Sequence, residues 1–451
     1  MTKKRLIYIA LGTLLTVTAC SQEDAIRGLS EGDSNRIIFR ASLPQLSTRA
    51  KEINKDNLDS FQVTCFINGT ATPYFSDKKF EKDNDRFLSP DPACVWPNNN
   101  AQLNFIAFTP SCGDMRNLDS FHDTDFVLTT GEQESYKLEN FNIARDIADQ
   151  IDFVTANATG NLLDNEESGI KLDFKHQLSR IEIKAYGANK SYDIEIAGIR
   201  IGGIAVKGDF NFISASGVTG ADAASSWEAL SKGIVEYVFR KDDHIITLDE
   251  TEASPTSLDK AISLMGSKGY ANSAMLIPAN NGKWDYEKNP GNQTNAQNST
   301  TEGAYLSVLL RVIDATNSAL KSQVYPYHDN TDNMEVVYLA VGSEGNVTDQ
   351  LNLYKGGDGK YYTDSANTIE YNPATGMEVK EFGWAALPIS GDWQPGLVYT
   401  YTLNYSDGVG LREPTDPTEP GKSIISDKVS VTVGVTDWQP GSSSTETVPR
   451  K

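Results

Sequence analysis

Apolar and polar side chains alternate at a period of two through most of the patterned segments of this chain. Successive residues of a β-strand point to opposite faces, so this alternation predicts strands with one buried face. The clearest cases are residues 37–43, 61–67, 103–108, 172–185 and 194–201. Turns rich in Asn, Asp and Gly separate them. The chain is therefore predicted to be all-β, with short helices expected only at residues 222–230 and 257–265.

The last patterned segment carries a row of valines. The row consists of Val429, Val431, Val433 and Val435, separated by small or polar residues. One face of this strand is expected to be buried while the other stays in water. Residues 412–422, which contain three prolines, predict a semi-rigid spacer before it. We therefore expect an extra C-terminal strand at the end of the fold.

The amino terminus has the pattern of a bacterial lipoprotein signal. Basic residues at positions 3–5 precede a short apolar run without charge, and small residues follow directly before Cys20. The run is too short to span a bilayer, which is typical of a cleaved signal. Residues 1–19 are predicted to be removed and Cys20 to receive palmitate-type acyl chains, several of which hold a protein to a membrane. An ordinary signal peptide followed by a chance cysteine is the alternative.

The residues after Cys20 and the overall charge indicate a location and exclude a partner. Glu23 and Asp24 resemble an export signal of surface lipoproteins, so an outer-membrane lipoprotein exposed at the cell surface is expected. Removing residues 1–19 discards three basic residues and no acidic one, which moves the net charge from −21 to −24. Such a chain repels phosphate backbones, so no nucleic-acid partner is expected.

The sequence contains no recognisable catalytic or metal-binding motif. The four histidines do not have helical metal-ligand spacing, and nucleophile-elbow, phosphate-loop and dinucleotide motifs are absent. We therefore predict that the chain is not an enzyme, with no catalytic residue, metal or cofactor. His176 is expected to be a packed, hydrogen-bonded residue of a strand, and residues 329–333 a solvated loop rather than a calcium site. The tryptophans are expected in the core.

Three cysteines remain after lipidation, so at most one disulfide can form. Cys65 lies in an apolar alternation and is expected to be a small buried hydrophobe. Pairing of Cys94 with Cys112 stays open.

One peptide bond stands out as a protease site. Residues 46–50 form a polar stretch with a single arginine, directly after the first expected strand. Exposed polar loops are where proteases cut, so the bond between Arg49 and Ala50 is a candidate for a trypsin-like enzyme.

Taken in order, these pieces resemble the fimbrillins, the subunits of type V pili, and the related Mfa-like lipoproteins of Bacteroidales-type anaerobes. The resemblance covers most of the chain. It rests on Cys20 and on the segments at residues 37–41, 48–50, 96–97, 103–110, 150–156, 172–180, 275–278, 393–401 and 437–438.

The resemblance implies two transthyretin-like β-sandwiches in tandem. The expected division is a signal peptide at 1–19, a lipidated propeptide with the first strand at 20–49, an N-terminal sandwich at 50–168, a C-terminal sandwich at 169–411, a linker at 412–428 and the candidate donor strand with its tail at 429–451. It also implies that an arginine-specific surface protease cuts after Arg49. The first strand then leaves, and a C-terminal strand from another fimbrial subunit fills its place.

The residues make physical sense of this exchange. The removable strand is expected to bury Ile37, Phe39, Ala41 and Leu43. Its large side chains each contribute about 1.5–3 kcal/mol on burial, so roughly 5–9 kcal/mol in all. Its loss leaves an apolar slot and unpaired backbone, which a strand from another chain can satisfy. Repeated head to tail, the contact does not close and gives a filament.

Several alternatives stay open. The same family includes anchor and tip subunits and relatives that do not polymerise, and the valine strand also has the option of pairing within its own domain. A surface lipoprotein that binds glycans would expose coplanar tryptophans, with Trp284 as the candidate. A hydrolase would need a cleft that joins acidic side chains from distant strands.

Overall fold

The computed structural model describes residues 35–43, 52–70, 72–90, 92–110, 127–129, 136–187, 189–212, 227–251, 254–265, 273–291, 303–316, 322–327 and 335–438. Strands make up nearly all of the regular structure in this part of the chain. The short helical turns are η4 (Ile147–Asp149), α2 (Leu162–Asn165) and η6 (Leu258–Lys260). Among these residues, no helix has the length and apolarity needed to cross a membrane.

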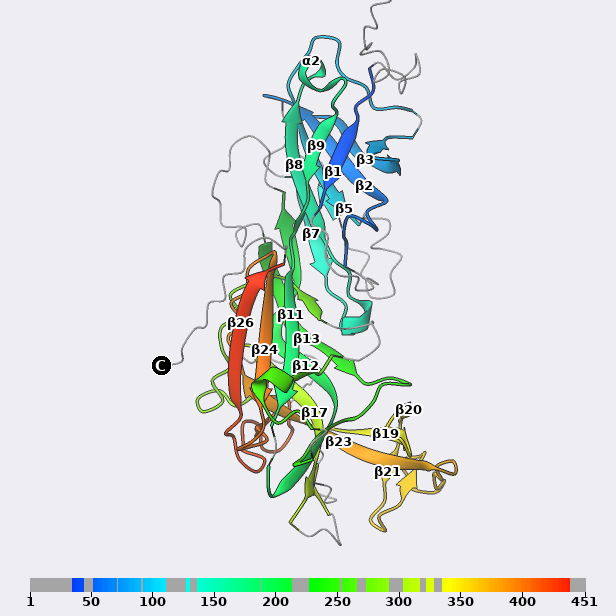
Figure 1. Ribbon diagram of the computed structural model, residues 1–451, viewed down its shortest axis with the longest axis vertical. Helices are drawn as coiled ribbons and strands as arrows, with labels where there is room; N and C mark the ends of the chain where they lie inside the picture. Colours follow the sequence, from blue (N-terminus) through cyan, green and yellow to red (C-terminus); the bar gives the residue numbers. More distant parts are fainter. Residues whose placement is uncertain are drawn as a thin grey trace, which may run out of the picture.

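An eight-stranded sheet forms the N-terminal end of the molecule, the upper half of Figure 1. Its order is β10-β8-β5-β2-β3-β4-β1-β9. The strands are β1 (Phe39–Ser42), β2 (Ser60–Ile67), β3 (Pro73–Asp83), β4 (Arg86–Leu88), β5 (Leu103–Thr109), β8 (Val154–Gly160), β9 (Ile170–Asp173) and β10 (Lys175–His176). One face encloses a core of its own, to which β1, β2 and β5 all contribute.

Two further sheets form the second half. The five-stranded sheet contains β11 (Ser179–Tyr186), β15 (Ile262–Ser263), β16 (Ala274–Leu276), β24 (Leu397–Asn404) and β26 (Ser430–Asp437). The eleven-stranded sheet contains β6 (Val127–Thr129), β7 (Lys137–Asn142), β12 (Tyr192–Asn211), β13 (Trp227–Val238), β14 (Ile246–Leu248), β17 (Tyr305–Asp314), β18 (Gln323–Tyr325), β19 (Val336–Gly342), β20 (Val347–Leu351), β23 (Met377–Pro388) and β25 (Leu411–Arg412). A small pair, β21 (Tyr354–Lys355) and β22 (Tyr361–Tyr362), stands apart.

These sheets enclose the largest core, which contains the isoleucines of β11 and β12 and the apolar residues of β17 and β24. Strands with alternating apolar residues must cover their apolar faces, and two packed layers do so. The prediction of an all-β chain with two β-sandwich units in tandem is confirmed.

The strand β12 joins the two halves. One end pairs with β14, where Ile194 lies opposite Leu248, and the other end pairs with β7, where Phe210 lies opposite Leu138. The large core accordingly reaches the second face of the eight-stranded sheet through Phe108 of β5. Strands β9 and β10 follow residue 168, yet they pair within the eight-stranded sheet. The two halves therefore share part of the large core.

The helices expected at residues 222–230 and 257–265 do not form in the described parts of these ranges. Trp227 starts the strand β13 and pairs with Phe210 of β12. The second range contains only the single turn η6, and Ile262 then pairs with Ala185 in β15. Pairing with a long neighbouring strand outweighs weak local helix propensity.

The segment 412–422 packs against the fold instead of acting as the expected spacer. The side chains of Arg412, Glu413 and Asp416 are buried. The Arg412 amide donates to the Lys422 carbonyl oxygen at 2.7 Å, and Leu411 pairs with Ala386 of β23. Within this loop, Arg412 also donates to the Thr418 hydroxyl at 3.1 Å.

A buried arginine fastens this loop to the sheet. Arg200 of β12 forms ion pairs with Glu236 at 2.8 Å, Glu335 at 3.0 Å and Glu413 at 2.9 Å. Its guanidinium also lies over the ring of Trp384, 4.0 Å from the centroid. Burial raises the pKa of the Glu413 carboxyl, although Arg200 opposes that shift. One buried cation therefore holds three carboxylates from separate segments together.

Candidate functional site

The predicted removable strand is an internal strand of the eight-stranded sheet. Phe39 of β1 pairs with Ile170 of the parallel strand β9 and with Phe87 of the antiparallel strand β4. Further backbone bonds hold both ends, from the Ile37 amide to the Cys94 carbonyl oxygen and from the Phe174 amide to the Ser42 carbonyl oxygen, each 2.9 Å. Removing β1 would therefore leave unpaired backbone groups on two neighbours.

The side chains of this strand reach the centre of the N-terminal core. Ile37 and Phe39 are fully buried, Leu43 is 4% exposed, and Ala41 is partly buried. These are the alternate residues that the sequence pattern places on one face. The strand therefore closes the core that it belongs to.

The ring of Phe39 occupies an aromatic pocket. Its centroid lies 5.9 Å from that of Phe61, 4.7 Å from that of Phe80 and 5.1 Å from that of Phe105, each in an edge arrangement. These partners come from β2, β3 and β5, and all three are buried. Edge contacts of this kind add to the area term, so Phe39 is the main anchor of β1.

Polar contacts fasten the outer face of the same strand. Arg40 forms an ion pair with Asp85 and donates from Nε to the Ser168 carbonyl oxygen at 2.9 Å. The hydrogen bond from Arg40 lowers the pKa of the exposed Asp85 carboxyl. The Ser42 hydroxyl donates to Asp173, and this bond, followed by Lys171, lowers the pKa of that carboxyl. These groups are exposed, so they help to specify the register of β1 but contribute little to the stability of the fold.

The candidate donor strand β26 pairs within its own sheet. It runs antiparallel to β24 over its whole length, from Asp437 opposite Leu397 to Ser430 opposite Asn404. It is the last strand of the sheet, and Figure 1 shows it beside β24 in the lower half of the molecule. Of the options that the sequence left open, the structure contains the pairing of the valine strand within its own domain.

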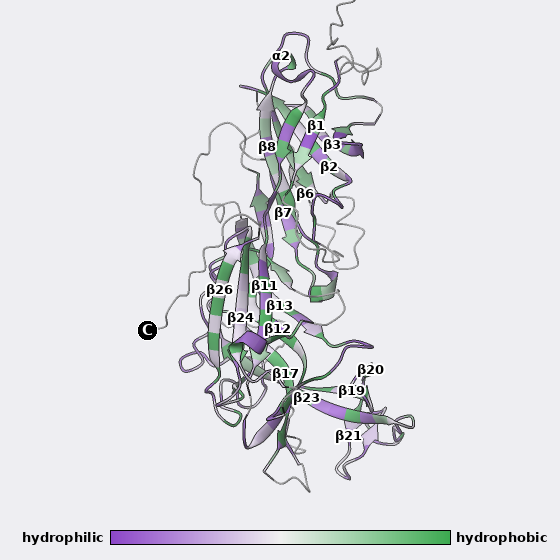
Figure 2. Ribbon diagram, viewed as in Figure 1, coloured by the Kyte–Doolittle hydropathy of each residue, from purple (hydrophilic) through white to green (hydrophobic). Residues whose placement is uncertain are grey.

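The packing of β26 is looser than that of β1. Val429 is 8% exposed, whereas Val431, Val433 and Val435 are only partly buried. In Figure 2 the strand β26 shows hydrophobic green bands separated by paler ones. A cavity of about 480 Å³ lies against the same row, lined also by Tyr399 and Tyr401 of β24. The strand is thus held on one edge and incompletely packed on its apolar face.

Trp438 closes the end of β26 against the first half of the molecule. It is 1% exposed and stacks on His176 of β10, with ring centroids 4.3 Å apart and planes within 3°. Its indole Nε1 donates to Glu52, and its amide donates to the Gly396 carbonyl oxygen at 2.8 Å. His176 in turn shares a 2.8 Å hydrogen bond with Asp152. The expected packed role of His176 is confirmed.

The sequence predicted that Trp438 lies in the core but did not indicate its partners. The signal is weak, because Glu52 and Trp438 lie 386 positions apart and no pattern in the sequence links them. Glu52 lies three positions after Arg49. The end of the candidate donor strand therefore contacts the beginning of the chain that the predicted cut would leave.

The predicted lipidation and cleavage residues lie outside the described part of the chain. These residues are Cys20, Arg49 and Ala50. Cys112 and the loop at residues 329–333 lie outside the described part as well. Cys65 and Cys94 are free, buried thiols, and burial raises the pKa of both. The expected burial of Cys65 is confirmed.

The glycan-binding alternative required exposed tryptophans. All six tryptophans of the chain are buried: Trp96, Trp227, Trp284, Trp384, Trp393 and Trp438. Trp284, the candidate for stacking on a sugar, is 1% exposed and donates to the Asn289 carbonyl oxygen at 3.1 Å. The expectation of core packing is confirmed, and no tryptophan face is available as a sugar platform.

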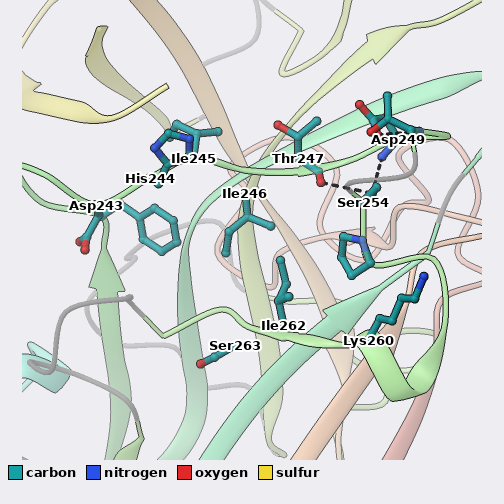
Figure 3. Close-up of a pocket in the computed structure, with 13 residues that line it drawn as sticks. Asp243, His244, Ile245, Ile246, Thr247, Asp249, Ser254, Lys260, Ile262 and Ser263 are labelled. Atoms are coloured by element: carbon teal, nitrogen blue, oxygen red, sulfur yellow. Dashed lines mark hydrogen bonds between the residues drawn. The ribbon is translucent and has the colours of Figure 1, made fainter. Parts of the chain in front are cut away.

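A cavity of about 640 Å³ opens beside β14 and the segment 254–263 (Figure 3). Two of its acidic residues are engaged locally. Asp243 accepts hydrogen bonds from the Tyr237 hydroxyl at 2.6 Å and the Arg240 amide at 2.8 Å, and Asp249 accepts from Thr251. A hydrolase cleft joins carboxylates from distant strands, whereas these two stabilise their own turns.

The comparison with known families identifies the family of the chain. The family model described as fimbrillin-like matches residues 48–438. The chain belongs to the fimbrillin-like family. Its role is that of a structural fimbrial subunit at the cell surface, which assembles with other fimbrial subunits. The matched span begins beyond β1 and ends with Trp438.

Solved structures resemble this fimbrillin-like chain only distantly. A fimbrial protein from Bacteroides vulgatus is 12% identical, with 90% of this chain and 100% of that chain covered and a TM-score of 0.49. A fimbrilin from Porphyromonas gingivalis is 11% identical, with 89% and 96% covered and a TM-score of 0.36. No curated protein sequence matches the chain.

Proposed function

We propose that this chain is the precursor of a polymerising fimbrial subunit. It is anchored through acyl chains on Cys20, an arginine-specific protease cuts between Arg49 and Ala50, and β1 is then exchanged for a strand of a neighbouring subunit. The observation that carries the proposal is the position of β1, which is internal and fully packed although it precedes the candidate cut.

The energetics favour exchange over a vacant slot. Ile37, Phe39 and Leu43 bury large side chains, which contribute roughly 5–9 kcal/mol together. After cleavage, β1 is held by these contacts, by the polar contacts of Arg40 and Ser42 and by its backbone pairing, all of them noncovalent, so the strand is able to dissociate. The vacant slot would expose the aromatic core and the edges of β4 and β9, which is a template for another strand.

The valine strand β26 is suited to leave its own sheet. It has one hydrogen-bonded neighbour among the described strands, β24, and a cavity lies against its valines. The place of β1 offers two neighbours, β4 and β9. The position of β26 at the edge of its sheet and the loose packing of its apolar face support a donor role for Val429, Val431, Val433 and Val435.

The geometry supports a filament over a closed dimer. Figure 1 shows β1 in one half of the elongated molecule and β26 in the other. A contact between two different surfaces is heterologous, and it continues from copy to copy when the rotation between copies does not close a ring. The lipid on Cys20 leaves with the propeptide, which frees the subunit from the membrane surface.

The test uses the purified chain from Cys20 onward, treated with an arginine-specific protease and run on a gel without boiling. We expect a ladder of multimers, which Arg49→Ala abolishes and which deletion of residues 429–451 also abolishes. Arg27→Ala is the matched control, because a cut at Arg27 leaves β1 attached. A protein that is cut at Arg49 and stays monomeric would overturn the polymerising role.

A further inference from the structure

The pocket around Phe39 sets a size requirement that this chain's own valine strand does not meet. We propose that the β1 slot binds a donor strand with a large aromatic side chain at the Phe39 position more tightly than it binds this chain's own valine strand. The inference rests on the proposed function, since it concerns which strand enters the slot.

The walls of the pocket are aromatic and packed against one another. Phe61 stacks with Phe80, with centroids 6.2 Å apart, and lies 4.7 Å from the ring of Phe87 and 5.1 Å from that of Phe174. Trp96 meets Phe105 edge to face at 6.0 Å. All of these rings are buried. Walls braced in this way do not collapse easily around a smaller side chain, so a valine in place of Phe39 leaves a cavity.

No register of the C-terminal strand brings an aromatic ring to this pocket together with the valine row. The valines occupy odd positions, and Trp438 is even, so a regular strand directs it to the opposite face. Placing Trp438 in the pocket puts Thr436 and Gly434 on the buried face instead of the valines. The rest of the chain, 439–451, contains no Phe, Tyr or Trp.

The valine row instead fits the sheet in which it lies. Val435 is opposite Tyr399, Val433 is opposite Tyr401, and Val431 is opposite Leu403. Small β-branched residues therefore face large residues of β24, and pairs of this type are favourable. A slot complementary to β26 would likewise supply the large side chains from its own walls. The slot of β1 differs, because its anchor ring comes from the inserted strand.

The donor and acceptor ends of this chain thus have different side-chain requirements. The acceptor end takes a strand with a phenylalanine-sized anchor, and the donor end offers only valines. Copies of this chain still join through the valine strand, but a fimbrial subunit whose donor strand carries such an anchor is expected to bind the slot more tightly. The partner is a fimbrial strand with alternating apolar residues and one aromatic among them.

The test measures peptide binding to the protease-treated chain by competition, with a fluorescent peptide of residues 36–43 as the probe. The competitors are the peptide of residues 429–437, its variants Val431→Phe, Val433→Phe and Val435→Phe, and the control Thr432→Phe, which alters the opposite face. We expect one of the three valine variants to bind at least about tenfold more tightly than the parent peptide, and the control to bind no better.

Each outcome has a distinct meaning. Equal binding of the parent peptide and of all three valine variants, with the probe bound, would overturn the aromatic requirement while leaving the slot intact. Failure of the probe itself to bind the treated chain would overturn the opening of the slot, and with it the proposed function. A gain for Thr432→Phe equal to that of the valine variants would reduce the effect to peptide hydrophobicity and would also overturn the requirement.

Discussion

Replacement of Trp438 by alanine tests how β26 is retained before any exchange. The indole is 1% exposed, stacks on His176 and donates to Glu52. Truncating a fully buried tryptophan costs about 3–5 kcal/mol. The remaining support of β26 is one ladder with β24 and a row of partly buried valines. We therefore expect Trp438→Ala to lower the free energy of local opening of β26.

The size of this free-energy loss determines which assay can detect it. A loss of about 3 kcal/mol multiplies the open population by roughly 100, since each 1.4 kcal/mol is a factor of ten. Native-state hydrogen exchange measures this directly, because amides of β26 should lose protection by that factor while amides of β5 keep theirs. Thr436→Ala is the control, an exposed change on the same strand, and should stay within about 0.5 kcal/mol.

Two outcomes would refute this reasoning. Unchanged exchange in β26 would mean that the ladder and the valines hold the strand without Trp438. Equal loss of protection in β26 and β5 would mean that Trp438 supports the whole fold, so that β26 has no separate opening step.

The remaining predictions concern the buried arginine. Arg200→Met should lower the free energy of unfolding by about 3–5 kcal/mol, because Glu413 is left buried without its partner, whereas Arg145→Met, at an exposed pair, should cost at most about 1 kcal/mol; urea unfolding measures both. Burial disfavours the charged form of Glu236, but Arg200 and Arg145 outweigh it and lower its pKa below the ordinary 4.5. Ionised Glu236 therefore stabilises the fold above pH 4.5. This contribution to the free energy of unfolding is lost as the pH falls through the lowered pKa. The pKa of Glu413 is raised, so burial favours its protonated form. The stability that protonated Glu413 contributes is present below pH 4.5 and is lost as the pH rises through the raised pKa. Unfolding curves between about pH 3 and 7 should show that Glu236→Gln removes the first trend and Glu413→Gln the second; the same slope in both variants would contradict the assignment.

Much of the local structure followed from the residue pattern. The period-two rows at 37–43, 61–67 and 103–108 became β1, β2 and β5, with the apolar faces buried as expected. Alternation is a local property, since each residue of a strand points opposite to the next whatever its neighbours are. The helices expected near 227 and 258 failed for the complementary reason, because strand pairing with distant segments overrode weak local preferences.

The candidate site was predictable only in its pieces. The pattern identified Ile37, Phe39 and Leu43 as a buried face and the valines as another, yet it did not rank the packing of the two strands. That difference comes from Phe61, Phe80 and Phe105 around Phe39, and from the cavity against the valines. Side chains from three separate strands create each environment, so no window of sequence contains it.

By itself, the sequence identified many of the strands and the apolar face of each, and its acidic charge predicted that nucleic acid is not a partner. The tertiary structure decided that β1 lies between β4 and β9, that β26 stays beside β24, and that Trp438 meets Glu52. The physical reason is that alternation specifies a strand and its faces, whereas the neighbour that a strand takes depends on competing long-range pairings and on how well side chains from distant segments fill the space between them.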